Sequence, residues 1–288
     1  MKFVSYLYAD KNAVGVLSAD EKHIIPVKAL GLTSDNMNDL ITELDGSLPE
    51  VTEKDMLRLS DVRLEAAIIE PKQDVICLGL NYRDHAAEAT KADAAYDVQR
   101  GEAVYFAKRV DRAVAPGGEI DGHFDINTGL DYEAELAVVI GRDAVNVKAE
   151  NVLDYIFGYT ILNDVSSRNL QTKHKQWYFG KSLDGFTPIG PCIVTADELG
   201  AMPELDIKCS VNGELRQSSN TRCMIFDIPY IIEELSAGMT LKAGTIISTG
   251  TPSGVILGMP PETQKYLRSG DVIRCEVEKI GVLENRVK

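Results

Sequence analysis

The run from residue 131 to residue 141, DYEAELAVVIG, constrains the fold and the chemistry of this chain most. Its apolar second half is typical of a strand, and residues two apart on a strand face the same way. Glu133 and Glu135 should therefore project together, where two carboxylates about 6–7 Å apart repel each other and burial makes both charges costlier. A positive group between them would relieve that repulsion. The alternative is an exposed strand end with both carboxylates solvated, the commoner situation for charged residues.

Two further residues favour a buried site over a solvated strand end. Asp164 closely follows the strand-like run 157–162, and an acid at the end of a buried strand is well placed to bind a metal. Lys181 lies among apolar neighbours in the segment 177–184, although a surface lysine could extend its ammonium to solvent there. Three oxygen ligands without a Cys or His cluster suit a hard cation, Mg²⁺ or Mn²⁺, rather than zinc. We therefore predict a metal site at Glu133, Glu135 and Asp164.

Short strand-like segments dominate the chain and predict its fold class. We predict strands at residues 3–8, 13–17, 23–27, 64–69, 75–80, 103–107, 132–140, 156–162, 191–195, 206–211, 245–248 and 272–277. We predict helices at residues 37–44, 84–90, 166–173 and 227–235. Many strands and few helices indicate an α+β, predominantly β fold with a rolled or barrel-like mixed sheet. Residues 1–70 should form a small N-terminal β-rich domain and residues 71–288 the catalytic domain.

Charge and cysteine usage exclude several classes of protein. The 30 Lys and Arg residues against 44 Asp and Glu residues leave a net charge of −14, which argues against nucleic-acid binding. The five cysteines form no C-x-x-C pair, and their odd number favours reduced thiols in the cytoplasm. The N-terminus turns polar too early for a signal peptide, and no segment approaches the ~20 apolar residues of a membrane helix. We expect a cytoplasmic protein that binds neither nucleic acid nor membrane.

A histidine and a glutamate three residues apart provide a second candidate site. If the chain is helical from about Asp84, His85 and Glu88 share a face. A carboxylate beside an imidazole orients it and raises its basicity, as a general base acting on water requires. Most such pairs on helices are surface pairs without a function. The polar segment 91–101 follows directly, and we predict that it forms a mobile lid that closes over the metal when substrate binds.

Five segments together resemble one family. They are GLNYRDH at residues 79–85, DYEAELAVVIG at 131–141, YTILNDV at 159–165, QWYFGKSLDGFTPIGP at 176–191 and STGTPSGV at 248–255. In this order and combination they resemble the fumarylacetoacetate hydrolase superfamily, specifically its bacterial two-domain members.

The resemblance implies a β-rich catalytic domain, a homodimer and Mg²⁺ or Mn²⁺ bound at Glu133, Glu135 and Asp164. Lys181 matches the lysine that contacts the substrate's enolate oxygen, and His85 with Glu88 matches the pair that activates water in hydrolytic members. Thr251 matches a contact to the substrate carboxylate. Three more candidates for substrate binding are Gly250, Arg83 and Gln171.

The implied substrate is a small 2-oxo acid that chelates the cation through its carboxylate and keto oxygens. Our first hypothesis is C–C hydrolysis of an acylpyruvate or a fumarylacetoacetate-type substrate, with Lys181 stabilising the oxyanion and His85 activating water. The alternatives on the same site are oxaloacetate decarboxylation, which needs no attacking water, and hydratase or isomerase activity. A hypothesis from a different class is a non-catalytic protein that uses the acidic pocket only to hold a cation. The presence of His85, Glu88 and Lys181 argues against it.

Overall fold

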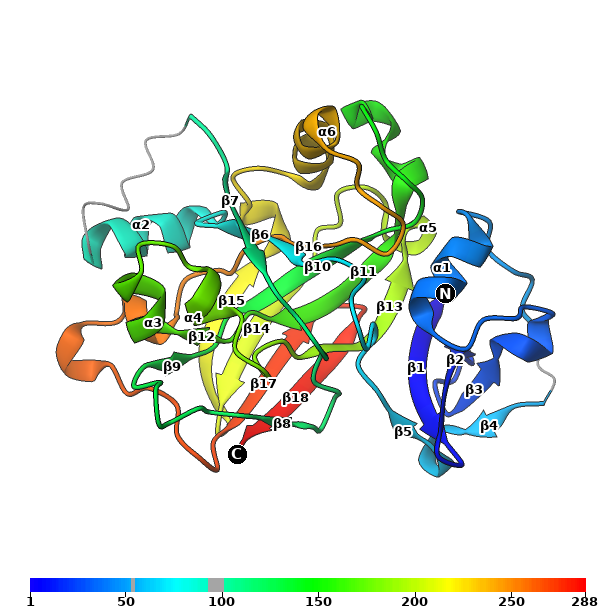
Figure 1. Ribbon diagram of the computed structural model, residues 1–288, viewed down its shortest axis with the longest axis horizontal. Helices are drawn as coiled ribbons and strands as arrows, with labels where there is room; N and C mark the ends of the chain where they lie inside the picture. Colours follow the sequence, from blue (N-terminus) through cyan, green and yellow to red (C-terminus); the bar gives the residue numbers. More distant parts are fainter. Residues whose placement is uncertain (53–54, 93–100) are drawn as a thin grey trace.

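The computed structural model describes residues 1–52, 55–92 and 101–288. Its largest sheet comprises β1 (Lys2–Tyr8), β2 (Lys11–Leu17), β3 (His23–Pro26), β4 (Leu57–Arg58), β5 (Arg63–Leu64), β6 (Val75–Gly79), β7 (Val104–Lys108), β10 (Ala134–Ile140), β11 (Ile156–Asn163), β13 (Ile189–Thr195) and β16 (Ile246–Ser248). The strand order is β4-β3-β2-β1-β13-β11-β10-β16-β6-β7, with β5 paired to β1. β16 and β6 are parallel, and the other neighbours are antiparallel. In Figure 1 this sheet extends from the N-terminal strands to β6 and β7 in the interior of the molecule.

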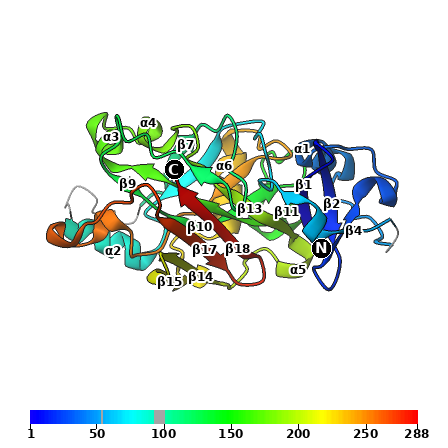
Figure 2. The same cartoon turned by 90° about the horizontal axis from the view of Figure 1, so that it is seen from below.

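A second sheet of five strands packs on the first. It comprises β8 (Glu119–Ile120), β14 (Asp206–Val211), β15 (Glu214–Asn220), β17 (Val272–Val277) and β18 (Gly281–Val287), in the order β15-β14-β17-β18-β8. Figure 2 shows β17 and β18 lying across β10 and β11 of the large sheet, and contacts of β14 with β10 and of β17 with β11 join the two sheets. β9 (Leu130–Asp131) and β12 (Ser166–Ser167) form a separate antiparallel pair.

Short helices lie around the two sheets. The α-helices are α1 (Met37–Leu44), α2 (Arg83–Ala92), α3 (Arg168–Lys173), α4 (Tyr178–Lys181), α5 (Ala196–Leu199) and α6 (Ile228–Gly238). The 3-10 helices are η1 (Val27–Leu30), η2 (Leu59–Asp61), η4 (Ala149–Tyr155), η5 (Thr221–Cys223), η6 (Ile256–Gly258) and η7 (Pro261–Thr263). In Figure 1, α2, α3 and α4 gather at the end of the molecule away from the N-terminal strands. No helix in the described ranges is both long and apolar enough to cross a bilayer.

The central strand β10 is buried on both faces, which explains its unbroken apolar sequence. Leu136 and Val138 pack into the core between the two sheets, whereas Ala137 and Val139 pack into a second core on the opposite face. The second core also contains Phe3 of β1 and residues of α1. The strand that carries Glu135 is therefore held from both sides, so its carboxylate has a fixed position.

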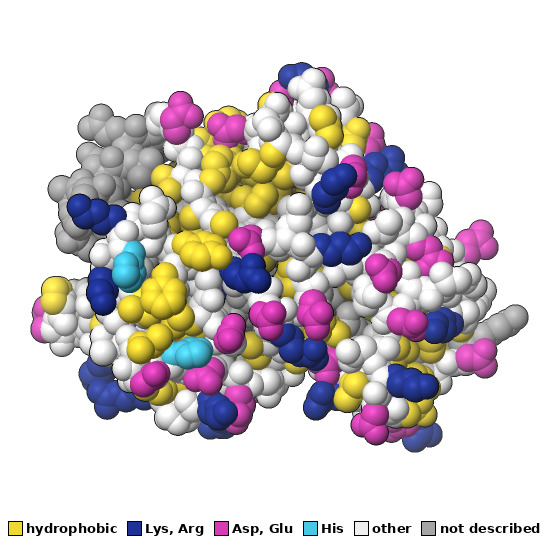
Figure 3. All heavy atoms as spheres, viewed as in Figure 1, with side chains coloured by type: hydrophobic (Ala, Val, Ile, Leu, Met, Phe, Trp, Pro, Cys, Tyr) yellow, Lys and Arg dark blue, Asp and Glu magenta, His cyan; other side chains and the backbone are white. Residues whose placement is uncertain are grey.

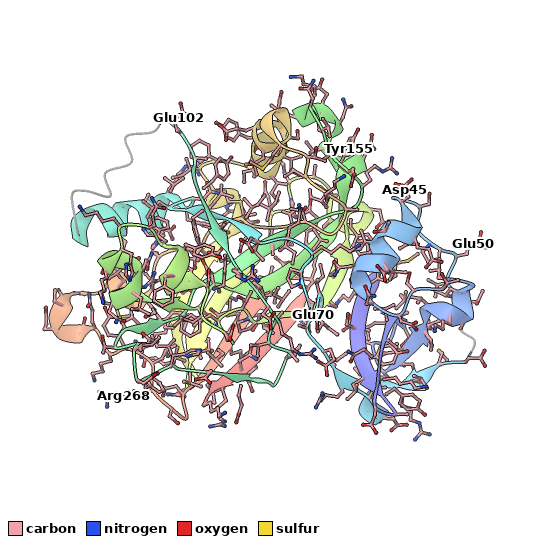
Figure 4. The ribbon with its side chains drawn as sticks, in the orientation of Figure 1. Asp45, Glu50, Glu70, Glu102, Tyr155 and Arg268 are labelled. Carbon is pink, nitrogen blue, oxygen red and sulfur yellow. The ribbon has the colours of Figure 1, made fainter. Side chains whose placement is uncertain are left out.

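The fold prediction of a predominantly β, α+β chain with mixed sheets is confirmed. Within the described residues both large sheets are open and do not close into a barrel. The division at residue 70 stays a prediction. Figure 4 labels Glu70 where the chain passes from the N-terminal strands to the rest of the molecule, and β1 continues the large sheet by pairing with β13.

Several element boundaries differ from the prediction. The strand expected at residues 64–69 is wrong beyond Leu64, because Glu65 N–H bonds to Ser5 O while Ala67 N–H bonds to Ile189 O. This segment crosses between two strands instead of pairing along one. β15 and β18 were not predicted. Residues 93–100 of the proposed lid lie outside the described residues.

The surplus negative charge is not concentrated on one side of the surface that Figure 3 shows, where acidic and basic side chains are interspersed.

Candidate active site

Three buried carboxylates meet where β10 and β11 lie side by side. Glu133 directly precedes β10, Glu135 lies within it, and Asp164 directly follows β11. Ala134 is the cross-strand partner of Asn163, so the antiparallel register brings the start of one strand to the end of the other. One oxygen of each carboxylate lies within 4.8 Å of the others. The structure thus brings the three predicted metal ligands together, although Glu133 lies just outside the strand expected to carry it.

Lys181 joins two of these carboxylates. It ends α4, and its Nζ lies 2.7 Å from Glu133 Oε2 and 2.7 Å from Asp164 Oδ2. Burial lowers the pKa of Lys181, but Asp164 and Glu133 raise it by more, so the ammonium keeps its charge. Burial has the opposite effect on the Glu133 carboxyl and raises its pKa. The positive charges of Lys181 and Arg168 outweigh burial and lower this pKa to about 2. The Lys181–Glu133 pair is therefore an ion pair at neutral pH.

Lys108 is a second buried cation, and the sequence prediction missed it. Its ammonium is 0% exposed, lies 2.6 Å from Asp164 Oδ1 and donates to Val165 O at 3.0 Å. Burial lowers the pKa of Lys108 and the Asp164 carboxylate opposes this effect. A cation at the end of the apolar strand β7 was the signal that could have identified it.

Arg168 and Asp131 support Glu133 from the other side. Arg168 Nη2 lies 2.7 Å from Glu133 Oε1, and its Nε donates to Asp131 Oδ2 at 2.8 Å. The fully buried Asp131 also accepts the backbone N–H groups of Ile256 and Leu257, both at 3.0 Å. Asp131 thus connects the cluster of buried carboxylates to the loop after β16. The sequence prediction assigned no role to either residue.

Glu135 differs from the other two carboxylates because no residue of the described chain forms an ion pair with it. Its Oε2 accepts hydrogen bonds from Ser248 Oγ at 2.5 Å and from the backbone N–H of Gly250 at 2.8 Å. Burial raises the pKa of Glu135 well above its ordinary value, and the nearby Asp164 and Glu133 carboxylates add to this rise. The cluster therefore lacks one positive charge, at Glu135.

His85 and Glu88 form the predicted pair on α2. The Nδ1 of His85 lies 3.1 Å from Glu88 Oε2. Glu88 also accepts the backbone N–H of Gly254 at 3.1 Å, and Asp84 accepts the hydroxyl of Ser253 at 2.9 Å. These contacts hold α2 on the loop after β16 and orient the imidazole.

The cluster opens into a cavity of about 550 Å³. Among the predicted site residues, those that line it are His85, Glu133, Gln171, Lys181 and Thr251. Glu135, Asp164, Glu88 and Gly250 are not among the described residues that line it. Arg83 is exposed, 3.5 Å from the carbonyl oxygen of Arg222, and is not brought to the cavity.

Three hydrogen bonds orient the polar residues of the wall. The hydroxyl of Thr251 donates to Ala134 O at 2.9 Å and accepts from Gln217 Nε2 at 2.8 Å. Arg168 Nη1 donates to Gln171 Oε1 at 2.9 Å, which leaves the Gln171 amide N–H groups for a ligand.

The model of the fumarylacetoacetate hydrolase C-terminal family matches residues 74–288. The chain belongs to this family. It is 45% identical over 233 residues to oxaloacetate tautomerase YisK of Bacillus subtilis, which covers 81% of this chain and 75% of that protein. It is 37% identical over 289 residues to a fumarylacetoacetate hydrolase domain-containing protein 2 homolog of Dictyostelium discoideum, with 97% and 90% covered.

Comparison with solved structures also supports membership of this family. A fumarylacetoacetate hydrolase from Exiguobacterium antarcticum superposes with a TM-score of 0.87 at 40% identity, over 100% of this chain and 99% of that one. A 5-carboxymethyl-2-hydroxymuconate delta-isomerase from Mycobacterium smegmatis gives a TM-score of 0.77 at 30% identity, with 100% and 99% covered. The chain is therefore an enzyme of the fumarylacetoacetate hydrolase superfamily, with a buried acidic triad that could hold a divalent metal.

Proposed function

We propose that this enzyme interconverts the keto and enol forms of a 2-oxo acid bound to Mg²⁺ or Mn²⁺. The observation that carries the proposal is Glu135, a buried carboxylate next to two others and without a cation of its own. A dication would supply the positive charge that Glu135 lacks. Both hydrogen bonds to Glu135 end on Oε2, so Oε1 is left to bind a metal. Glu133, Glu135 and Asp164 would hold the ion, and their all-oxygen donor set fits a hard cation.

When bound, the cation supplies a Lewis acid for the oxygens of the 2-oxo acid. Residues of this chain stabilise the enolate, transfer the proton and orient the substrate. The Lys181 ammonium adds positive charge beside the oxygen that becomes negative as the enolate forms. His85, oriented by Glu88, moves the proton to and from the neighbouring carbon. Thr251 and Gln171 face the cavity and contact the substrate's polar end. The 45% identity to an oxaloacetate tautomerase supports this assignment.

Hydrolysis of an acylpyruvate is the second candidate function. The His85–Glu88 pair beside the cavity favours it, because attack by water needs a positioned general base. The likeness to the Exiguobacterium fumarylacetoacetate hydrolase favours it as well. Both reactions pass through an enolate that Lys181 would stabilise.

One pair of assays tests both candidates. Purified enzyme with Mg²⁺ should accelerate the loss of the ultraviolet absorbance of enol-oxaloacetate, and EDTA should abolish the effect until Mg²⁺ or Mn²⁺ is restored. Release of pyruvate and acetate from acetylpyruvate under the same conditions measures hydrolysis. Full tautomerase activity in metal-stripped enzyme with EDTA would contradict the metal assignment, and no activity with any 2-oxo acid would reject the proposed function.

We also propose that the enzyme is a homodimer, as the family resemblance implies, and that it is cytoplasmic, which its odd number of cysteines without a C-x-x-C pair favours. The scattered charge of the face in Figure 3 neither requires nor excludes a partner there. Light scattering on the purified protein measures its mass directly, and a monomer at micromolar concentration would contradict the dimer.

A further inference from the structure

The cavity is larger than the polar end of a 2-oxo acid. Pyruvate has six non-hydrogen atoms, and at a water's share of ~30 Å³ each they displace at most roughly 180 Å³. The cavity measures about 550 Å³. Most of its volume therefore lies beyond the group that the carboxylates and Lys181 would bind.

An apolar wall begins directly beside Lys181. Its Nζ lies 5.3 Å from the centre of the Phe106 ring, and the Phe106 and Trp177 rings meet edge to face with centroids 5.1 Å apart. Trp177 packs over Gly79, where a Cβ would come within 2.3 Å of its ring. All four residues line the cavity. The aromatic surface is thus continuous with the reacting end of the site.

The loop after β16 supplies a second part of this apolar lining, and Leu78 and Leu80 add to it. The contributors from the loop are Val255, Leu257, Met259, Pro260 and Pro261. Asp131 holds the backbone of this loop through the N–H groups of Ile256 and Leu257. The apolar lining is therefore a fixed part of the site.

The charged groups in the wall are already engaged with the protein. Lys181 binds Glu133 and Asp164, and Arg168 binds Asp131 and Glu133. Of the described residues that line the cavity, these are the two that carry a permanent positive charge. A carboxylate carried farther from the keto group than the second carboxylate of oxaloacetate would therefore lose its hydration without gaining an unpaired cation.

We propose that the site selects 2-oxo acids whose carbon chain continues into an uncharged apolar group, which packs on Phe106, Trp177 and the loop after β16. The inference rests on the proposed function for the polar end of the substrate. It assigns the specificity to Trp177 in particular, because Trp177 belongs to the apolar lining without contacting the carboxylate cluster.

The test is a calorimetric binding series on the Mg²⁺-loaded enzyme, with oxamate as the polar end alone and its N-propyl and N-hexyl derivatives as probes of the tail. Each CH₂ group that is buried should tighten binding by up to about fourfold. N-(2-carboxyethyl)oxamate, of similar length to the propyl compound but charged, should bind more weakly than N-propyl oxamate.

Three variants test which residues bind the alkyl tail. Trp177→Ala should reduce the ratio of hexyl-oxamate to oxamate affinity by about tenfold or more, and a ratio within one variant cancels any general loss. Tyr178→Ala, which removes the adjacent but exposed ring, should keep the wild-type ratio. Leu257→Ser tests the same wall from another segment, in case Trp177→Ala fails to fold.

The two possible failures are distinguishable. If oxamate binds and the alkyl tails add nothing, or the carboxyethyl compound binds best, the apolar selection is wrong while the proposed function stands. If none of the probes binds with Mg²⁺ or Mn²⁺, the proposed function and this inference are both overturned.

Discussion

At the scale of single residues, we expect Glu135 to destabilise the metal-free protein, because its carboxylate is buried beside two others. The same residue is one of the three proposed metal ligands. Replacing it with Gln keeps an oxygen for the Ser248 and Gly250 hydrogen bonds and removes the buried charge. We expect Glu135→Gln to stabilise the metal-free protein at neutral pH and to weaken Mg²⁺ binding by at least about tenfold. Urea unfolding and calorimetric titration measure the two effects. A variant that binds Mg²⁺ as tightly as wild type would show that Glu135 is not a ligand.

The pH dependence of the metal-free protein provides a second readout. Because the pKa of Glu135 is raised in the folded state, the folded protein retains a proton that the unfolded chain releases above about pH 4.3. This contribution should therefore destabilise the protein increasingly as the pH rises from that value through the raised pKa. Glu135→Gln should not show this pH-dependent loss of stability. Identical stability–pH profiles for the wild type and the variant would show that Glu135 does not destabilise the folded protein.

His85 tests the proton-transfer assignment. Loss of a positioned general base typically costs about 10²–10⁴-fold in rate, so His85→Ala should lower kcat for enol-oxaloacetate by that factor. Oxamate affinity with Mg²⁺ should change little, because the carboxylate cluster stays intact. Acetylpyruvate hydrolysis should fall at least as far. An unchanged tautomerisation rate would mean that another group moves the proton.

The clustering of Glu133, Glu135 and Asp164 could be predicted from sequence because all three lie at or near the ends of two recognisable strands. Of the charged residues that contact or support them, Lys181 was predicted, but Lys108, Arg168 and Asp131 were not. Lys108 and Asp131 act through long-range contacts, with Asp164 in one case and with Arg168 and the loop after β16 in the other. No local pattern encodes such pairings, which depend on the order of the strands in the sheet.

At the scale of elements, a hydrogen bond and close packing join α2 to the loop after β16. Gly254 N–H binds Glu88, and Gly258 packs so closely on Glu88 that a Cβ there would lie 2.1 Å from its Cδ. The absence of a side chain at Gly258 therefore lets Glu88 reach both Gly254 and His85. The position of the histidine depends on a loop more than 160 residues away in sequence.

Gly258→Ala should push Glu88 away from His85. We expect kcat for enol-oxaloacetate to fall by roughly tenfold, less than in His85→Ala, because the imidazole remains but loses its orienting carboxylate. Gly238→Ala is the matched control, since a Cβ at Gly238 meets nothing within 4 Å. Equal rates in the two variants would show that this packing does not position the base.

Element predictions succeeded where hydrophobic patterning was strong and failed where it was weak. The apolar segments of β10 and β11 were located from sequence, whereas β15, with the sequence ELRQSSN, offers no alternation of apolar residues. Its one buried side chain is Gln217, which bonds Thr251 and the backbone N–H of Ala134. A strand stabilised by a buried amide rather than an apolar face gives no periodic signal, so Gln217 was missed as a support of the active site.

At the scale of the whole molecule, the N-terminal strands and the catalytic part share a sheet and a core. Phe3 lies opposite Ile193 in the β1–β13 pair, and its ring centroid lies 5.3 Å from that of Phe157. The same core includes Leu40 of α1 and Val139 of β10. Two regions joined in this way should unfold together, even if residues 1–70 form a unit of their own by sequence.

Phe3→Ala tests this coupling. Phe3 is fully buried, and loss of such a ring typically costs about 3–5 kcal/mol. Because the core is shared, we expect calorimetry to show a single transition at a lower temperature in the variant, and loss of oxamate binding should coincide with it. Tyr8→Ala, at the exposed end of the same strand, should shift the transition by less than about 0.5 kcal/mol. Two separate transitions in Phe3→Ala, with oxamate binding surviving the first, would instead show that the catalytic part folds without the N-terminal strands.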